Sequence, residues 1–220
     1  MIEDKRRYFI TFEGIEGSGK STVAGAVLER FLQAGLECIS TREPGGTGIS
    51  EKIREMLLDP ANTSITARAE LLLYVASRAQ LVSEVIGPAL KSGTSVLCDR
   101  FMDASVAYQG WARGLGEDVV SELNSFAVGG AVPDRTFLFD LEVDAGFERG
   151  PDRREETGLR SRDRLELEKR TFHEKVREGY LRIASREPDR VVVIDASRPL
   201  GDVIDAVMRN LQVLQGLKSL

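Results

Sequence analysis

The sequence predicts an α/β fold in which helices cover both faces of a five-stranded parallel sheet. Short apolar runs of β-branched and aromatic residues alternate with longer helical patterns along the chain. Such runs are typical of strands buried on both faces, and the helices between them favour right-handed crossovers and parallel pairing. A glycine-rich motif joins the first strand to the first helix. Together these observations predict three layers: helices, sheet and helices.

Each element follows from its local pattern. The expected strands are the short apolar runs at residues 8–12, 37–41, 95–98, 135–139 and 191–194. The expected helices are the longer segments with helical apolar spacing, at residues 22–33, 49–58, 68–86, 118–128, 164–185 and 200–214. Neither an internal repeat nor a low-complexity linker interrupts them, so we expect a single domain over residues 1–220.

Composition limits the function classes. Apolar residues make up 42% of the chain, enough for a core, and the net charge is −5. This acidic balance argues against binding to nucleic acid, and no apolar run approaches the roughly 20 residues that cross a bilayer. The first seven residues carry charges but no apolar signal core, so we expect a cytoplasmic protein with no membrane partner.

Cysteine and histidine usage adds two expectations. Cys38 and Cys98 each lie in a predicted strand, where buried, reduced thiols are expected. The single histidine, His173, lies among charged residues of a predicted helix, so we expect it at the surface. One histidine without a cysteine cluster gives no basis for a zinc site.

Residues 14–21 read Gly-Ile-Glu-Gly-Ser-Gly-Lys-Ser and fill every fixed position of the pattern G-x-x-x-x-G-K-[ST]. Glycines let backbone amides face a polyphosphate, and the following helix N-terminus adds partial positive charge. Lys20 can reach the outer phosphates and Ser21 can hold magnesium. A glycine-rich turn with a solvated Lys20 is the alternative, and many P-loop NTPases share the motif. We expect this P-loop fold and an ATP phosphate site formed by Gly14, Ile15, Glu16, Gly17, Ser18, Gly19, Lys20, Ser21 and Thr22.

Charged pairs follow the second and third predicted strands. Arg42 and Glu43 precede a Pro-Gly-Gly run, and Asp99 and Arg100 follow residues 95–98. Ligands of open α/β sheets bind at the carboxyl ends of the strands, where both pairs meet the phosphate loop. Asp99 is placed to associate with magnesium, and Arg100 to clamp a phosphate. Either pair could be a surface ion pair, but their joint position favours two phosphate-bearing ligands, as in a kinase.

Two further segments are candidates for the site. Tyr74 and Arg78 are four residues apart on one helix face, where an aromatic plane and a guanidinium can hold a nucleobase. Alternatively, Tyr74 belongs to the core and Arg78 to the solvent. Residues 149–164 contain six arginines and almost nothing apolar, so we expect a mobile lid at about residues 146–165. A solvated loop balanced by its acidic residues is the alternative.

The chain resembles the thymidylate kinase family, whose members phosphorylate dTMP to dTDP. The resemblance runs from about residue 8 to about residue 214. It rests on residues 42–47, 77–80, 99–101, 105–110, 163–166 and 193–196. Two positions depart from the family pattern: Ser77 stands where an acidic residue is usual, and Tyr74 where phenylalanine is commoner. It implies the nucleoside monophosphate kinase type of the fold, ATP and dTMP as substrates, Mg²⁺ as cofactor, and a homodimer through helix 68–86 and its neighbours.

The resemblance also implies roles for individual residues. Tyr74 would stack on thymine and Arg78 would donate to its O4, a contact that disfavours cytosine. Tyr108 would crowd the 2′ position of the sugar, and the donor adenine would rest near residues 196–200. The implied dTMP site comprises Glu16 at the 3′-hydroxyl, Arg42 and Arg100 at the phosphate, and Tyr74, Arg78, Ser105, Tyr108 and Gln109 around the base and sugar. The implied metal ligands are Ser21 and Asp99.

Bacterial-type members of the family carry a catalytic arginine in the lid. This chain matches that arrangement, because its phosphate loop contains Glu16 and no arginine. The implied catalytic residues are Lys20, Arg100, Glu43 and the lid candidates Arg153, Arg154 and Arg160. Another nucleoside monophosphate kinase is the first alternative, and a regulatory P-loop ATPase is the second.

Overall fold

The strands and helices of the computed structural model follow the order that the sequence predicts. The structure describes residues 7–149 and 163–215. Its strands are β1 (Phe9–Gly14), β2 (Cys38–Arg42), β3 (Ser95–Asp99), β4 (Arg135–Asp140) and β5 (Val191–Asp195). Its helices are α1 (Lys20–Gln33), α2 (Gly48–Leu58), α3 (Ala67–Leu81), η1 (Val82–Ile86), α4 (Gly87–Lys91), α5 (Met102–Ser105), η2 (Val106–Ala112), α6 (Glu117–Val128), α7 (Val143–Arg149), α8 (Arg170–Arg186) and α9 (Leu200–Gln215).

The sheet is parallel throughout, with the strand order β2-β3-β1-β4-β5. In its register, Phe12 of β1 and Arg42 of β2 both lie opposite Asp99 of β3. Gly14, where β1 ends, lies opposite Phe139 of β4. The predicted five-stranded parallel sheet is therefore confirmed, and the carboxyl ends of its central strands meet at one edge, where ligands of open α/β sheets bind.

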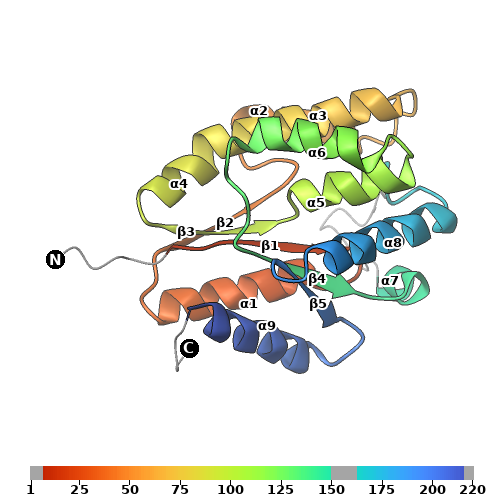
Figure 1. The fold of residues 1–220 in the computed structure, drawn as a ribbon. Coiled ribbons are helices and arrows are strands. Elements are labelled where there is room, and N and C mark those ends of the chain that lie inside the picture. Colours follow the sequence, from red (N-terminus) through yellow and green to blue (C-terminus); the bar gives the residue numbers. More distant parts are fainter. Residues whose placement is uncertain (1–6, 150–162, 216–220) are drawn as a thin grey trace, which may run out of the picture.

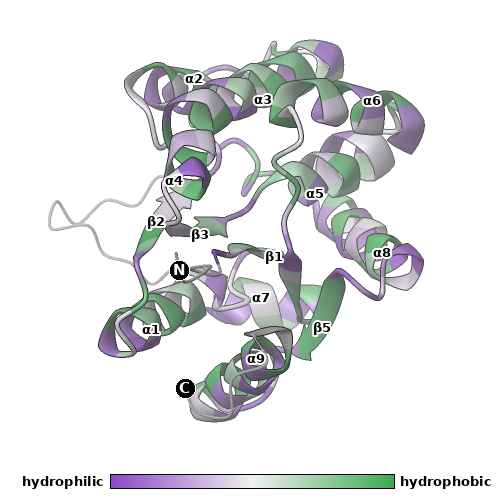
Figure 2. Cartoon of the chain, turned by 60° about the vertical axis from the view of Figure 1, so that its left-hand side comes forward, coloured by the Kyte–Doolittle hydropathy of each residue, from purple (hydrophilic) through white to green (hydrophobic). Residues whose placement is uncertain are grey.

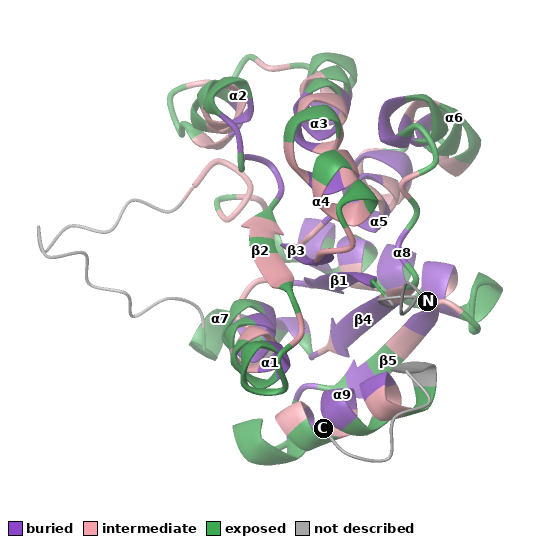
Figure 3. Ribbon diagram, turned by 90° about the vertical axis from the view of Figure 1, so that its left-hand side faces the viewer, coloured by how far each residue is buried: buried purple, intermediate pink, exposed green. Residues whose placement is uncertain are grey.

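Helices cover both faces of the sheet (Figure 1). α1 and α9 pack together on one face, and α3, α4, α5, α6 and α8 lie on the other. The view in Figure 3 shows the strands lying between these two groups of helices. The predicted three-layer arrangement is thus confirmed. None of the helices in the described ranges is long and apolar enough to span a bilayer.

Apolar side chains of the two central strands form the middle of the core. Ile10 and Phe12 of β1 pack in one cluster with Phe137 and Phe139 of β4, all inaccessible to solvent or nearly so. The helices close this cluster with apolar stripes, and in Figure 2 hydrophobic (green) and hydrophilic (purple) residues alternate along the helical ribbons, as they do in amphipathic helices. This rigid centre holds the carboxyl edge of the sheet in place. Cys98 is buried within β3, whereas Cys38 on the edge strand β2 is half-buried, and both are free thiols.

Two predicted helix boundaries differ from the structure. The helix expected over 68–86 is divided: α3 ends at Leu81, a π-helical turn follows, and α4 begins at Gly87. The helix expected from residue 164 begins only at Arg170. The residues before it form turns because the Asp163 carboxylate accepts the backbone N–H groups of Leu165 and Glu166, each at 2.9 Å. Such local bonds offer the backbone an alternative to the helix.

Short helices at α5, η2 and α7 are absent from the sequence prediction. α7 includes residues 146–149, which we expected to begin the lid. Tertiary contact explains the helix: a Cβ on Gly146 would come within 2.7 Å of the Glu16 carbonyl oxygen, so only glycine allows α7 this close to the phosphate loop. A short segment with a central glycine has low helix propensity, and packing overrides that propensity here.

Candidate active site

The loop between β1 and α1 has the geometry of a phosphate cradle. Gly17 and Gly19 have φ values of 75° and 83°, in the left-handed region that favours glycine. Gly17 also lies against α7, where a Cβ would be 2.2 Å from the Gly146 carbonyl oxygen. Lys20 begins α1 and is 7% exposed, with Nζ 3.9 Å from Oε2 of Glu16. Burial, followed by the charge of Arg100, lowers the pKa of Lys20.

Oxygen-bearing side chains lie in and beside this loop. Ser21 donates its hydroxyl hydrogen to Oδ2 of Asp99. Over the described ranges, Oδ1 of Asp99 and Oγ of Ser18 are buried and have no hydrogen-bond partner. Buried polar atoms are normally paired, so these two oxygens indicate a ligand position. Carboxylate and hydroxyl oxygens suit Mg²⁺, which commonly takes one or two protein carboxylates and completes its coordination with phosphates and water.

A cavity of about 120 Å³ adjoins the loop between α3, η2 and α8, and we call it the Tyr74 cavity. Its volume is small, but its walls are formed by side chains from five separate parts of the chain. Six of the sequence-predicted residues line it: Glu16, Tyr74, Arg100, Ser105, Tyr108 and Gln109. The catalytic candidate Glu43 also lines it. The structure therefore brings most of the predicted acceptor site into one place.

Arg100 is held in this cavity from both its backbone and its side chain. It has a φ of 67°, which is uncommon for a residue with a side chain and often marks a functional site. Its Nη1 donates to the Tyr180 hydroxyl at 3.1 Å, and its guanidinium lies 5.3 Å from the centre of the Tyr108 ring. Tyr180 in turn donates to Glu13 at 2.7 Å, and the next amide, that of Phe101, donates to Glu13 at 2.7 Å.

Glu13 is a buried carboxyl group that the sequence analysis missed. Burial first, and the charge of Asp103 second, raise its pKa from an ordinary 4.5 to about 8, although Arg100 and the bonds from Tyr180 and Phe101 oppose this. The signal in the sequence was an acidic residue within an otherwise apolar strand directly before the glycine loop. A buried carboxyl group requires hydrogen-bond partners, which here come from the segment after β3 and from α8.

Arg78 lies behind the wall of the Tyr74 cavity. It is 0% exposed, and its Nε donates to Glu43 at 3.0 Å while its Nη2 donates to Ser105 at 2.8 Å. Nη2 also pairs with the second Glu43 oxygen, and Nη1 donates to Asn124. Glu43 and Ser105 face the cavity, but Arg78 is not one of its lining residues. Its predicted contact with a base remains a prediction.

Arg54, rather than the predicted Arg42, lines the Tyr74 cavity. Nη2 of Arg42 donates to both carboxylate oxygens of Glu51, at 2.9 and 3.0 Å, and these exposed side chains lie outside the cavity lining. Arg54 of α2, which the sequence analysis did not select, lines the cavity and donates to the Pro44 carbonyl at 2.8 Å. Helix α2 carries this cation to the cavity because it folds back against α3.

The prediction that His173 lies at the surface is wrong. The side chain is 4% exposed and lines the Tyr74 cavity, and burial lowers its pKa. Among the described residues its Nε2 is buried without a hydrogen-bond partner. Helical spacing could have identified it, because His173 lies three and seven residues before the buried Val176 and Tyr180 and so belongs to the apolar stripe of α8.

A second cavity of about 440 Å³, the Arg149 cavity, lies on the other side of the phosphate loop. It is lined by Ser18 and Gly19 of the loop and by residues 196–200. Arg149 borders it and donates to the carbonyls of Ala196 and Ser197, at 2.6 and 3.2 Å. The lid candidates Arg153, Arg154 and Arg160 lie outside the described residues.

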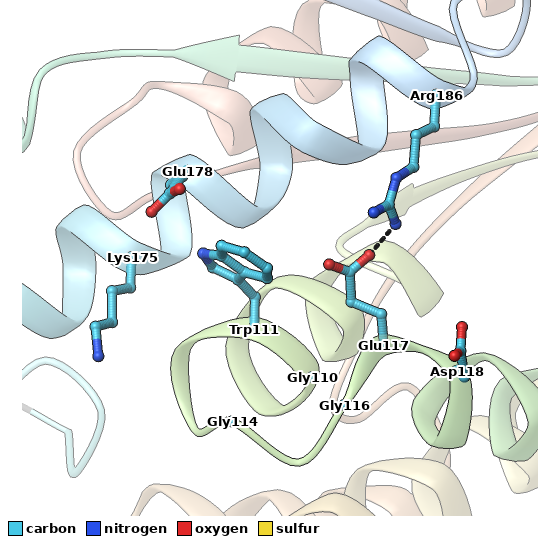
Figure 4. A pocket seen from close by; sticks show the side chains of 9 residues that line it. All are labelled: Gly110, Trp111, Gly114, Gly116, Glu117, Asp118, Lys175, Glu178 and Arg186. Carbon is cyan, nitrogen blue, oxygen red and sulfur yellow. Dashed lines mark hydrogen bonds and ion pairs between the residues drawn. The ribbon is translucent and has the colours of Figure 1, made fainter.

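The third cavity, the Trp111 cavity, is larger, at about 500 Å³, and shares no lining residue with the other two. Figure 4 shows the Trp111 ring between Lys175 and Glu178 on one side and Glu117 on the other, with Arg186 paired to Glu117. The guanidinium of Arg182 lies 4.0 Å from the centre of the Trp111 ring. The Trp111 cavity is therefore an open depression near the surface, and charged side chains surround it.

Comparison with known proteins places these observations in a family. A family model described as thymidylate kinase matches residues 12–207. Thymidylate kinase of Desulfosudis oleivorans is 50% identical over 205 residues, covering 93% of this chain and 96% of that protein. Thymidylate kinase of Lactobacillus delbrueckii subsp. bulgaricus is 51% identical, covering 92% and 94%. The crystal structure of thymidylate kinase from Ehrlichia chaffeensis superposes with a TM-score of 0.73 at 31% identity, covering 94% and 99%.

Proposed function

The chain belongs to the thymidylate kinase family, and on that premise we propose that it transfers the γ-phosphoryl group of ATP to dTMP, giving ADP and dTDP. One observation carries the proposal: the phosphate loop and the Tyr74 cavity adjoin and share Glu16. Arg100 lies at the cavity wall, close enough to Lys20 for its charge to lower the pKa of Lys20. Two anionic ligands bound in these places would meet between Lys20 and Arg100. This is the arrangement that phosphoryl transfer requires.

The donor would bind along the loop from Gly14 to Thr22. Backbone amides of the loop and the N-terminus of α1 face this position, and Lys20 would contact the outer phosphates. The Arg149 cavity, bounded by residues 196–200, supports the predicted position of the adenine. Arg149 and the loop glycines would then enclose the nucleotide from two sides.

Mg²⁺ would be held by Ser21 and Asp99, whose oxygens beside the loop fit this cation. When bound, it supplies positive charge that neutralises the donor phosphates. Within the described residues no cluster of three or more His, Cys, Asp or Glu side chains could hold a metal. A site built from one carboxylate and one hydroxyl therefore depends on the nucleotide for its other ligands.

The acceptor would occupy the Tyr74 cavity. Tyr74 would stack on the base, Ser105 and Gln109 would bind its edge, and Tyr108 would crowd the 2′ position of the sugar. The Glu16 carboxylate would accept a hydrogen bond from the 3′-hydroxyl. Most N–H donors of Arg78 are already used by Glu43, Ser105 and Asn124, so its contact with O4 would require one of these bonds to be shared or exchanged.

In the reaction, an oxygen of the acceptor phosphate attacks the γ-phosphorus, and the bond to the β–γ bridging oxygen breaks. Arg100 would hold the attacking phosphate, and Arg42 would join it on leaving Glu51. Glu43 would keep Arg78 and the cavity wall in position, and Lys20 would stabilise charge on the transferred group. Catalysis then consists of alignment and charge stabilisation, without a covalent enzyme intermediate.

A lid arginine, one of Arg153, Arg154 and Arg160, would supply a further cation. An arginine in this role contributes about 10³–10⁵ in rate in related phosphoryl transfers. The absence of arginine from loop residues 14–21 supports a source elsewhere in the chain. Single alanine substitutions at the three positions, compared by kcat, would identify the residue that acts.

We also infer a cytoplasmic homodimer. Leu72 of α3 and Val119 and Phe126 of α6 are exposed apolar side chains on two helices that pack together, and Phe126 is 85% exposed. A second copy covering this face would remove it from water. Sedimentation of the parent chain and of Phe126→Asp would test this, with a shift toward monomer expected for the variant. The free thiols of Cys38 and Cys98 support the location.

ADP release tests the activity directly. The rate is measured with dTMP, dUMP, dCMP, UMP, AMP and GMP, and without an acceptor, in the presence of Mg²⁺. We expect dTMP to give the highest kcat/KM. Equal rates with all monophosphates, or equal ATP hydrolysis without an acceptor, would contradict the proposal and favour a less selective kinase or a regulatory ATPase.

A further inference from the structure

Gln109 lines the Tyr74 cavity, and its side-chain amide is hydrogen-bonded to a buried residue outside the cavity lining. Its Nε2 donates to Oε1 of Glu70 at 2.8 Å, and both side chains are 1% exposed. In the described part of the chain, this is the one hydrogen bond of the Gln109 side chain. Its Oε1 therefore receives no donor from these residues and is left to a ligand.

Glu70 can act only as an acceptor because cations surround it. Arg113 donates to its two oxygens at 3.2 and 3.1 Å, and Nη2 of Arg164 lies 2.6 Å from Oε2. Burial raises the pKa of Glu70, but hydrogen bonds from Arg113 and Gln109 and the charge of Arg113 bring it below its ordinary value. An ionised carboxylate has no hydrogen to donate, so it can hold only the NH₂ end of the Gln109 amide.

These cations are themselves fixed by the protein. Nη1 of Arg113 lies 2.6 Å from Oε1 of Glu168, and the guanidinium lies 4.5 Å from the centre of the Phe172 ring. Arg164 donates to the Leu57 carbonyl at 2.9 Å. The orientation of the Gln109 amide is thus set before any ligand arrives, and a preorganised acceptor discriminates better than one that can rotate.

We propose that Glu70 is a positioning residue for base selection: it holds Nε2 of Gln109 so that Oε1 accepts the N3–H of a pyrimidine-2,4-dione. The inference rests on the proposed function and deepens it. Thymine carries a hydrogen on N3, whereas N3 of cytosine carries a lone pair. The same Oε1 attracts the first and repels the second, at the ring atom next to the carbonyl whose O4 is expected to contact Arg78.

The substitution Glu70→Gln tests this relation. An amide at position 70 can accept or donate, so the Gln109 amide is free to turn over. We expect the ratio of kcat/KM for dTMP to that for dCMP to fall at least about 10-fold, the scale of one buried hydrogen bond. Glu168→Gln is the matched control, because it removes the other carboxylate on Arg113 without touching Gln109. Its ratio should equal that of the parent chain.

An unchanged ratio in Glu70→Gln, or an equal fall in Glu168→Gln, overturns the inference. If circular dichroism shows Glu70→Gln to be unfolded, the parent chain is tested with the 5′-monophosphate of N3-methylthymidine. This analogue lacks the N3–H and should be used at least about 10-fold less efficiently than dTMP. Equal use overturns the inference. A parent chain that does not phosphorylate dTMP contradicts the proposed function instead, so the two failures are distinguishable.

Discussion

The Tyr74 cavity and the Trp111 cavity hold their charged side chains in opposite ways. In the Tyr74 cavity, the wall residue Glu43 is paired with Arg78, and both side chains are almost completely buried. In the Trp111 cavity, which is about four times larger (about 500 against about 120 Å³), Glu117 is paired with Arg186, whose side chain is 57% exposed. Buried pairs sit in a low dielectric and keep one geometry, whereas exposed pairs are screened and mobile.

Preorganised charge, rather than volume, distinguishes the candidate active site. Arg100, Gln109 and Ser105 each have a buried partner that fixes one orientation. Such groups can act on a ligand without first losing conformational freedom. The predictions below test whether the two cavities differ in this way, beginning with the largest expected effect.

Arg78→Met removes the buried partner of Glu43 and should lower the free energy of unfolding by about 3–5 kcal/mol, because a carboxylate is left uncompensated in the interior. Urea denaturation monitored by circular dichroism measures this change. The double variant with Glu43→Gln should recover part of the loss. A decrease of less than about 1 kcal/mol in the free energy of unfolding would mean that the Arg78–Glu43 pair contributes no more than an exposed ion pair.

The pH dependence of stability should reveal Glu13. The folded chain retains its proton up to about pH 8, whereas the unfolded chain releases it near 4.5. The folded chain therefore binds more protons in this interval, so the free energy of unfolding falls as the pH rises from about 4.5 to about 8, and this contribution is then constant. Its size is on the order of 5 kcal/mol.

Denaturation curves at several pH values measure the slope. Glu13→Gln should flatten it over this interval, whereas Glu117→Gln in the Trp111 cavity should not. An identical slope in Glu13→Gln and the parent chain would show that the buried carboxyl group titrates as it does in water.

Tyr180→Phe removes the hydroxyl that joins Arg100 to Glu13. The loss of one hydrogen bond is worth about 1 kcal/mol, so KM for dTMP should rise about 5-fold while KM for ATP changes little. Initial rates with one substrate varied at saturating concentration of the other give both constants. Equal changes in the two constants would indicate general damage rather than a loosened Arg100.

Arg186→Ala should have the smallest effect. It removes the exposed partner of Glu117, and such pairs contribute about 0–1 kcal/mol. We expect the free energy of unfolding to change by less than about 0.5 kcal/mol and kcat/KM for dTMP to stay within about 2-fold. A larger loss of activity would give the Trp111 cavity a role that its exposed charges do not suggest.

Much of the fold could be predicted because its signals are local. Five apolar runs separated by helical patterns define the parallel sheet, and the pattern at residues 14–21 places a phosphate loop at the end of β1. Six of the eight predicted acceptor residues also line one cavity. Strand ends and helix periodicity are properties of short segments, so they can be read before the chain is folded.

The sequence by itself determined which residues reach the carboxyl edge of the sheet and the chemical family to which they belong. Only the tertiary structure decided which of them face a ligand and which support others. It placed Arg78 behind Ser105, brought Arg54 and His173 into the cavity, and joined Glu13 to Arg100 and Glu70 to Gln109. The partners in these pairs come from elements far apart in the chain, and burial and partner identity are properties of packing that no spacing within one segment encodes.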